Sequence, residues 1–289
     1  MEETTFTIES TDGEQVFVYR WAPDGDPKAV VQIAHGMGEH AARYRRLGEA
    51  LVDAGYVVYA NDHRGHGRTA GSVDRQGDLG AAGWIGLVDD ISALTARARA
   101  EHPGIPLVLL SHSMGSFALQ QYLLDRSADL DAAVLSGTSA VDIIAGGLDT
   151  TQPADLSAFN APFEPARTEY DWLSRDDAEV DKYVDDPGCG FGVDAAGMTQ
   201  MLADSAQLAD AERLAAIRDD LPMYIFSGDA DPLAGGGSLI EMVADRYRQA
   251  GVKDVTVKLY PGARHETLNE TNRDEVTADL IAWLDRVTG

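Results

Sequence analysis

The sequence predicts an α/β protein in which helices cover both faces of a mostly parallel β-sheet. Two patterns support this prediction. Apolar segments of strand length alternate along the chain with segments whose apolar residues recur with a helical period of about 3.6 residues. Strands that alternate with helices in this way form parallel sheets that are buried on both faces. The chain has 289 residues, of which 44% are hydrophobic, and is long enough to bury a large core.

The first expected elements form an antiparallel pair at one edge of the sheet. Polar and apolar residues alternate in residues 5–9 and 15–19, on either side of the turn sequence Asp12-Gly13. The remaining strands are expected at 29–34, 56–60, 106–110, 132–135, 223–226 and 255–260. The main helices are expected at 42–54, 84–100, 116–125, 239–250 and 273–287.

One interval breaks this alternation. More than 80 residues separate the strands expected at 132–135 and 223–226, whereas a strand-helix-strand unit takes about 30. The surplus mixes glycine, proline and aspartate with dispersed aromatic residues. We therefore expect a small helical cap at 141–203, inserted between two parts of an α/β core at 1–140 and 204–289. A helix at 206–217 would return the chain to the sheet.

Composition argues against several classes of partner. The chain has 48 acidic and 23 basic residues, a net charge of −25, which disfavours nucleic acids and anionic membranes. No apolar run approaches the roughly 20 residues that span a bilayer, and the acidic start lacks the features of a signal peptide. We expect no stable membrane insertion and a cytoplasmic location.

Cys189 is the only cysteine, which excludes an intrachain disulfide and a cysteine metal cluster. Whether the chain forms a homodimer stays open.

Ser113 is the strongest candidate for a catalytic residue. It lies in Ser111-His112-Ser113-Met114-Gly115, between the strand expected at 106–110 and the helix expected at 116–125. A sharp strand-turn-helix connection exposes a serine at its apex and requires small residues two positions before and after it. Gly115 fits this pattern, and Ser111 is small but departs from the usual glycine. The alternative is a serine that only caps the helix.

A serine nucleophile needs a base, and the base needs an acid that orients it. Asp229 and Asp231 follow the strand expected at 223–226, and His265 follows the strand expected at 255–260. The order serine, aspartate, histidine is that of the α/β-hydrolases. The spacing alone leaves both aspartates open as the acid.

Four motifs resemble those of the monoacylglycerol lipase and lysophospholipase branch of the α/β-hydrolases, and the likeness extends nearly end to end. They are His35-Gly36-Met37-Gly38-Glu39-His40 with Arg43-Tyr44, Asn61-Asp62-His63-Arg64-Gly65-His66-Gly67, the segment around Ser113, and Gly228-Asp229-Ala230-Asp231. The resemblance implies an eight-stranded, mostly parallel sheet with a helical cap after the sixth strand. It implies a serine esterase that acts on small or single-chain esters such as monoacylglycerols, without a cofactor or metal. It also implies Ser113 as nucleophile, Asp231 as acid and His265 as base.

The oxyanion that forms when a serine attacks an ester needs backbone N–H donors. One donor is expected from Met114, the residue after the nucleophile. The resemblance assigns the second to Met37, which two glycines flank. The alternative role for both side chains is core packing, which is compatible with a donated backbone N–H.

The expected cap carries aromatic residues that are candidates for binding substrate. They are Phe159, Phe163, Tyr170, Trp172 and Phe191. These residues either line a pocket for the acyl chain or pack the small core of the cap, and the sequence does not decide between the two.

Other polar residues near the motifs are expected to be structural. His63 and His66 lack a third metal ligand nearby in the sequence. His35 and His112 are expected to order local hydrogen bonds. Glu39 and Arg43, four positions apart at a helix start, are expected to form an ion pair.

Two other functions remain as alternatives. One is an aminopeptidase-type serine hydrolase, which would use the same triad. The other is a noncatalytic ligand receptor, because a fold by itself does not prove activity.

Overall fold

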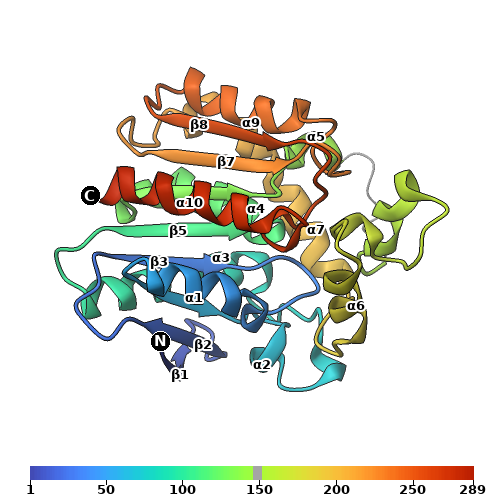
Figure 1. Ribbon diagram of the computed structural model, residues 1–289, viewed down its shortest axis with the longest axis horizontal. Coiled ribbons are helices and arrows are strands. Elements are labelled where there is room, and N and C mark those ends of the chain that lie inside the picture. Colours follow the sequence, from blue (N-terminus) through green and yellow to red (C-terminus); the bar gives the residue numbers. More distant parts are fainter. Residues whose placement is uncertain (146–151) are drawn as a thin grey trace.

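The computed structural model describes residues 1–145 and 152–289, and its central element is an eight-stranded sheet in the order β1-β2-β4-β3-β5-β6-β7-β8 (Figure 1). The strands are β1 Glu2–Glu9, β2 Gln15–Ala22, β3 Ala29–Ala34, β4 Tyr56–Asn61, β5 Leu107–His112, β6 Ala132–Ser136, β7 Met223–Gly228 and β8 Val255–Tyr260. From β4 to β8 the neighbours are parallel, whereas β2 is antiparallel to both β1 and β4. The expected fold class is therefore confirmed.

Helices cover both faces of the sheet (Figure 1). They are α1 Arg45–Asp53 and α10 Arg273–Thr288 on one face, and α3 Gly83–Glu101, α4 Met114–Arg126 and α9 Ser238–Gln249 on the other. Alternate residues of each strand supply the two cores: in β5, Leu107 and Leu109 pack with α3 and α4, whereas Val108 and Leu110 pack with α1 and α10. Burial on both faces explains why the central strands read as continuous apolar runs.

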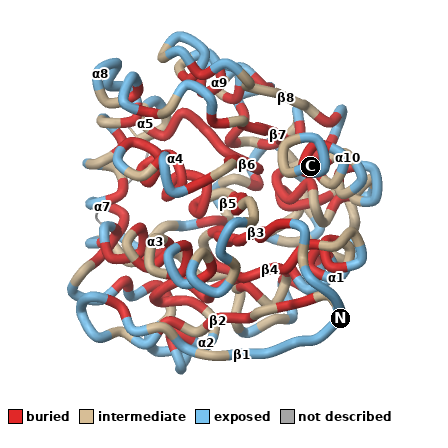
Figure 2. The backbone as a smooth tube through the Cα atoms, turned by 90° about the vertical axis from the view of Figure 1, so that its left-hand side faces the viewer, coloured by how far each residue is buried: buried red, intermediate tan, exposed pale blue. Residues whose placement is uncertain are grey.

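The edge of the sheet differs from its centre. β1 is largely exposed, and it pairs with β2 through the expected turn at Asp12-Gly13, with Phe6 opposite Val18 (Figure 2). Gly13 has a φ of 89°, a left-handed conformation that favours glycine in such a turn. The antiparallel hairpin at the edge is therefore confirmed.

Every element described between β6 and β7 is helical. These elements are α5 Val141–Ile144, η5 Leu156–Phe163, η6 Asp171–Leu173, α6 Asp177–Asp185, α7 Ala195–Asp204, η7 Ser205–Ala209 and α8 Ala211–Leu214, where η marks a 3₁₀ helix. Leu156, Trp172, Leu173 and Tyr183 form a small core of their own. α7 instead joins the main core beside α3 through Met198 and Met201. The cap bounds of 141–203 stay a prediction.

The helix expected at 206–217 is interrupted. The chain forms η7 and then the separate short helix α8, because the side chain of Asp210 accepts hydrogen bonds from the N–H groups of Glu212 and Arg213. Such a side chain caps a new helix start and favours a break in the preceding one. Among the residues described, no helix combines the length and apolar character needed to cross a bilayer.

Candidate active site

Ser113 occupies the sharp turn between β5 and α4. Its φ of 49° and ψ of −121° make it the one residue other than glycine with a positive φ in the described part of the chain. Backbone strain of this kind costs on the order of 1–3 kcal/mol and is typical of functional sites. The Ser113 N–H donates to the carbonyl of Ser136 at 2.9 Å, which ties the turn to β6.

The residues two positions from Ser113 show why the turn needs small side chains. A Cβ atom on Gly115 would lie 2.3 Å from the carbonyl oxygen of Ala34, so only glycine fits without a shift of backbone. On the other side, Ser111 is buried and its hydroxyl donates to the carbonyl of Val134 at 2.8 Å. The serine that departs from the usual glycine is thus accommodated by a hydrogen bond to the neighbouring strand.

The loops after β7 and β8 bring Asp231 and His265 together. Nδ1 of His265 lies 2.9 Å from Oδ2 of Asp231, and both residues are 2% exposed. Asp231 also accepts from the Ser227 hydroxyl at 2.8 Å and from the Leu233 N–H at 2.9 Å. Asp229 is exposed, and its carboxylate accepts the Gly262 N–H instead. The geometry therefore pairs Asp231, and not Asp229, with the histidine.

The electrostatics of this pair suit a base. Burial opposes charge on both groups, but their mutual attraction outweighs it, so the pKa of His265 is raised and that of Asp231 is lowered. An ionised Asp231 accepts the proton on Nδ1, which leaves Nε2 as the basic nitrogen. Nε2 is buried and has no hydrogen-bond partner among the residues described. It is available for a proton from Ser113, which borders the same cavity.

The loop after β3 holds Met37 in a fixed position. Gly36 N–H donates to Oε1 of Glu39 at 2.7 Å, and Gly38 N–H donates to Nε2 of His66 at 3.3 Å. Met37 lies between these two anchored glycines, and Met114 is the first residue of α4, where a helix leaves N–H groups without partners of its own. Both methionines border the cavity with Ser113. The arrangement is compatible with the predicted oxyanion donors.

A cavity of about 440 Å³ opens onto Ser113 and His265, and its lining is mostly apolar. Of the five aromatic candidates, Phe159 and Trp172 border it. Other apolar residues that line the cavity were not predicted; they come from the neighbouring helices and from the loop after β7 and include Phe117, Val141, Leu156, Met198, Met201 and Leu233. Helical spacing could have found several of them, because Phe117 follows Ser113 by four residues and Met198 and Met201 are three apart.

The other three aromatic candidates are absent from the described lining of the cavity, so the structure favours packing, the other role considered for them. Phe163 lies under the guanidinium of Arg264, 4.3 Å from ring centre to Cζ. The Tyr170 hydroxyl donates to the carbonyl of Gly190 at 2.9 Å, and Phe191 packs on the His66 ring. Each is held by a contact outside the cavity.

Comparison with known proteins shows the family of this chain. The family described as serine aminopeptidase, S33, matches residues 25–272. A monoacylglycerol lipase of Mycolicibacterium smegmatis is 35% identical over 91% of this chain and 90% of its own. The human monoglyceride lipase is 30% identical over 96% of this chain and 89% of its own. The chain belongs to the monoacylglycerol lipase branch of the α/β-hydrolases.

The solved structures extend the family likeness to three dimensions. A thermostable carboxyl esterase of Bacillus coagulans, in complex with glycerol, superposes with a TM-score of 0.89 at 29% identity and full coverage of both chains. A monoglyceride lipase variant of Saccharomyces cerevisiae has a TM-score of 0.77 at 23% identity, over 97% of this chain and 94% of its own, and shows the shared fold.

Three buried histidines support the loop after β3 of this hydrolase. Nε2 of His35 accepts from the His63 N–H at 3.0 Å, and Nδ1 of His66 bonds the Arg64 carbonyl at 2.9 Å. Burial lowers the pKa of His35 well below its usual value, that of His63 to about 3 and that of His66 to about 4. Each ring is therefore neutral at pH 7, and the rings of His35 and His66 each accept a backbone N–H through Nε2.

A buried ion-pair network connects the loop after β3 to the loop of His265. Arg43 contacts Glu39 at 2.6 Å, as expected, and also binds both carboxylate oxygens of Glu266 at 2.7 Å. The Tyr44 hydroxyl donates to Glu39 at 2.8 Å. The role of Glu266 was missed, although its position next to His265 was a signal. Burial disfavours its charge, but Arg43 outweighs this effect and lowers the pKa of Glu266 to about 2.

Trp172 packs against His265. Its ring centre lies 4.8 Å from that of His265, and its carbonyl accepts the His265 N–H at 3.3 Å. The ring centre of His112 also lies 4.8 Å from that of His265. This contact was not predicted, since the two roles considered for Trp172 were pocket lining and cap packing, and the contact joins segments more than 90 residues apart.

Proposed function

We propose that this hydrolase cleaves monoacylglycerols and other single-chain carboxylic esters through an acyl-enzyme on Ser113. The observation that supports this function best is the cavity, which joins the strained serine, the free Nε2 of His265 and a mostly apolar lining. A buried apolar cavity favours an acyl chain, because each methylene removed from water contributes about 0.8 kcal/mol.

The mechanism uses groups of the protein and water. Nε2 of His265 takes the proton of the Ser113 hydroxyl, and Oγ forms a bond to the acyl carbon. The N–H groups of Met37 and Met114 hold the oxyanion. As the intermediate collapses, the bond to the alcohol oxygen breaks and the alcohol leaves with the proton from His265. Water, activated by the same nitrogen, then attacks the acyl-enzyme and releases the acid. These steps require no cofactor.

Residues 141–203 act in this proposal as a cap over the acyl pocket. Leu156, Phe159 and Trp172 reach the cavity from this segment. A pocket covered by a cap admits an ester with one acyl chain more readily than an ester with three. We place the protein in the cytoplasm, and the single cysteine, which cannot form an intrachain disulfide, agrees with a reducing compartment.

A panel of mono-, di- and triesters of one acyl chain tests the substrate class. We expect kcat/KM to be highest for the monoester and to rise by roughly fourfold per added methylene until the cavity is full. The triester should react poorly. Equal or greater efficiency on the triester would contradict the roofed pocket.

The family description favours one other activity, cleavage of an N-terminal residue, so aminoacyl anilides belong in the same panel. We expect efficient turnover of esters and little turnover of anilides, and the reverse order would replace the esterase by an aminopeptidase.

Ser113→Ala is the inactive control for both the ester and the anilide assays, and we expect it to lose on the order of a millionfold in turnover. Persistent fluorophosphonate labelling of this variant would move the nucleophile elsewhere, and absence of any turnover by the folded wild-type protein would favour a receptor.

A further inference from the structure

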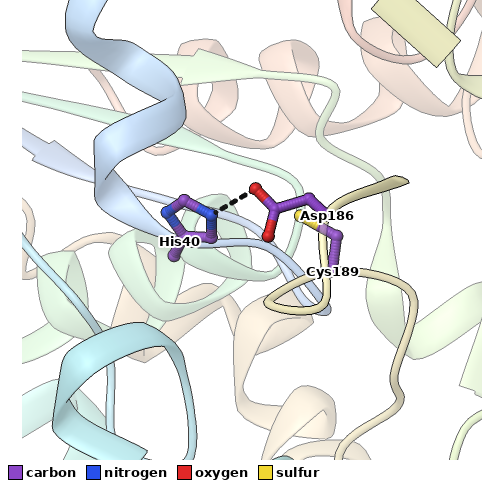
Figure 3. Close-up of side chains that lie close together, drawn as sticks. All are labelled: His40, Asp186 and Cys189. Atoms are coloured by element: carbon purple, nitrogen blue, oxygen red, sulfur yellow. Dashed lines mark hydrogen bonds and ion pairs between the residues drawn. The ribbon is translucent and has the colours of Figure 1, made fainter. Parts of the chain in front are cut away.

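A second cluster of reactive side chains lies outside the catalytic cavity. His40, Asp186 and Cys189 each offer one ligand atom, and these atoms all lie within 4.8 Å of one another (Figure 3). Nε2 of His40 and Oδ2 of Asp186 are 3.0 Å apart. His40 lies in the loop after β3, whereas Asp186 and Cys189 belong to the loop after α6. Two segments that are distant in the sequence thus converge on one point.

We propose that His40, Asp186 and Cys189 bind a zinc ion. An imidazole nitrogen, a carboxylate oxygen and a thiolate are the three ligand types that proteins use for zinc. The thiolate and imidazole select a borderline-soft metal and disfavour magnesium and calcium, which prefer oxygen ligands. Three protein ligands leave a fourth position for water.

The local geometry supports coordination. Zinc bonds of roughly 2.0–2.3 Å place ligand atoms about 3–4 Å apart, so small side-chain rotations suffice to close the cluster. The loop is also preorganised: the Cys189 N–H donates to the Asp186 carbonyl at 3.0 Å, and the Gly188 N–H donates to Oδ1 of Asp186 at 2.8 Å. The second bond orients the carboxylate in the way that outer hydrogen bonds orient metal ligands.

The site is accessible and its charge is balanced. All three residues are half-buried, and two surface cavities of about 300 and 410 Å³ both border His40 and Asp186. The nearby charge of Arg43 is offset by Glu39 and Glu266, which bind its guanidinium. Burial raises the pKa of the Cys189 thiol, so the metal has to displace a proton from it.

A bound zinc ion would tie the loop after α6 to the loop after β3. The two loops are already in contact, since the Gly190 N–H donates to the Gly38 carbonyl at 3.0 Å and the Tyr183 hydroxyl donates to it at 2.8 Å. Because the ligands converge only in the folded chain, zinc should stabilise the folded state. At about 100 times Kd, we expect Tm to rise by roughly 4 °C.

Metal binding to the purified full chain, freed of metal with a chelator, tests the proposal without relying on activity. Equilibrium dialysis should find a single zinc ion per chain. Cobalt(II), used as a spectroscopic probe, should give a thiolate charge-transfer band in the near ultraviolet. Cys189→Ser should remove the band, and both Cys189→Ser and His40→Gln should weaken zinc binding at least roughly tenfold.

Asp185→Asn is the matched control, because Asp185 is the exposed neighbour of Asp186 and should leave binding unchanged. Circular dichroism checks that each variant is folded, and the two ligand variants lie on different segments, so a folding defect in one leaves the other decisive. A missing thiolate band in the wild-type protein would overturn the proposal. Zinc affinity that is equal in Cys189→Ser, His40→Gln and the wild type would also overturn it.

Discussion

At the scale of single residues, the site depends on a few side chains whose neighbours fix their protonation. In the proposed mechanism, His265 acts as the base because Asp231 holds the proton on the other ring nitrogen and raises the pKa of the imidazole. The two carboxylates of the Gly228-Asp229-Ala230-Asp231 motif differ only in direction and burial: Asp231 points to the histidine, and Asp229 is exposed and binds a backbone N–H.

The two aspartates should therefore respond very differently to the same substitution. Asp231→Asn should reduce turnover by roughly 10⁴, because it removes the group that fixes the tautomer of His265. Asp229→Asn should cost far less, and it serves as the matched control. Measured kcat values in the reverse order would make Asp229 the acid.

The pH dependence of Asp231→Asn provides a second readout. The carboxylate stabilises protonated His265, so its loss lowers the pKa of this base. The acid limb of kcat/KM against pH should therefore move to lower pH in this variant and stay in place in Asp229→Asn.

At the scale of elements, the loops after β3 and β8 are held together by the network of Arg43, Glu39 and Glu266. Loops alone would position catalytic groups loosely, since they carry few backbone hydrogen bonds of their own. In this protein, buried ion pairs hold the two loops where backbone hydrogen bonds of a helix or sheet are absent. Arg43 is 12% exposed at its side chain and satisfies two carboxylates that are nearly buried.

Arg43→Met should destabilise the protein by about 3–5 kcal/mol, because removal of one partner leaves buried charge unpaired. Arg45→Met is the control two positions away. The side chain of Arg45 is 55% exposed and pairs with Glu3 and Glu49, so its loss should cost less than about 1 kcal/mol. Urea unfolding monitored by circular dichroism measures both, and similar losses would refute the structural importance of the network.

At the scale of the whole molecule, the buried neutral histidines link stability to pH. In the unfolded chain these rings titrate near 6.5, whereas His63 and His66 do so at about 3 and about 4 in the folded protein, and His35 well below its usual value. As pH falls below 6.5, the unfolded state binds protons that the folded state excludes. The stability is present above this pH and is lost towards pH 4.

Each of these histidines should contribute up to about 1.4 kcal/mol of lost stability per pH unit in that window. Urea unfolding at pH 7, 6 and 5 should show a falling free energy of unfolding. His66→Gln keeps an acceptor for the Gly38 N–H. It should reduce the change in the free energy of unfolding per pH unit by about the contribution of one histidine. A free energy that is constant from pH 7 to 5 would show that these rings titrate normally.

The sequence by itself determined the elements and their order, because the signals for them are local. Apolar periodicity predicted the strands at 29–34 and 255–260 with the bounds that the structure has. It also predicted a turn at Ser113 with small flanking residues. These features depend on backbone sterics and on burial of one face, which a short stretch of sequence records.

Tertiary structure decided which side chains meet. It paired Asp231 with His265, joined Arg43 to Glu266 across more than 200 residues, and placed Trp172 against the histidine. It placed Phe163, Tyr170 and Phe191 in contacts outside the pocket. It also divided the helix expected at 206–217, because Asp210 caps a separate helix there. Periodicity gives the face on which a side chain lies but not its neighbours, because these depend on how segments distant in sequence pack together.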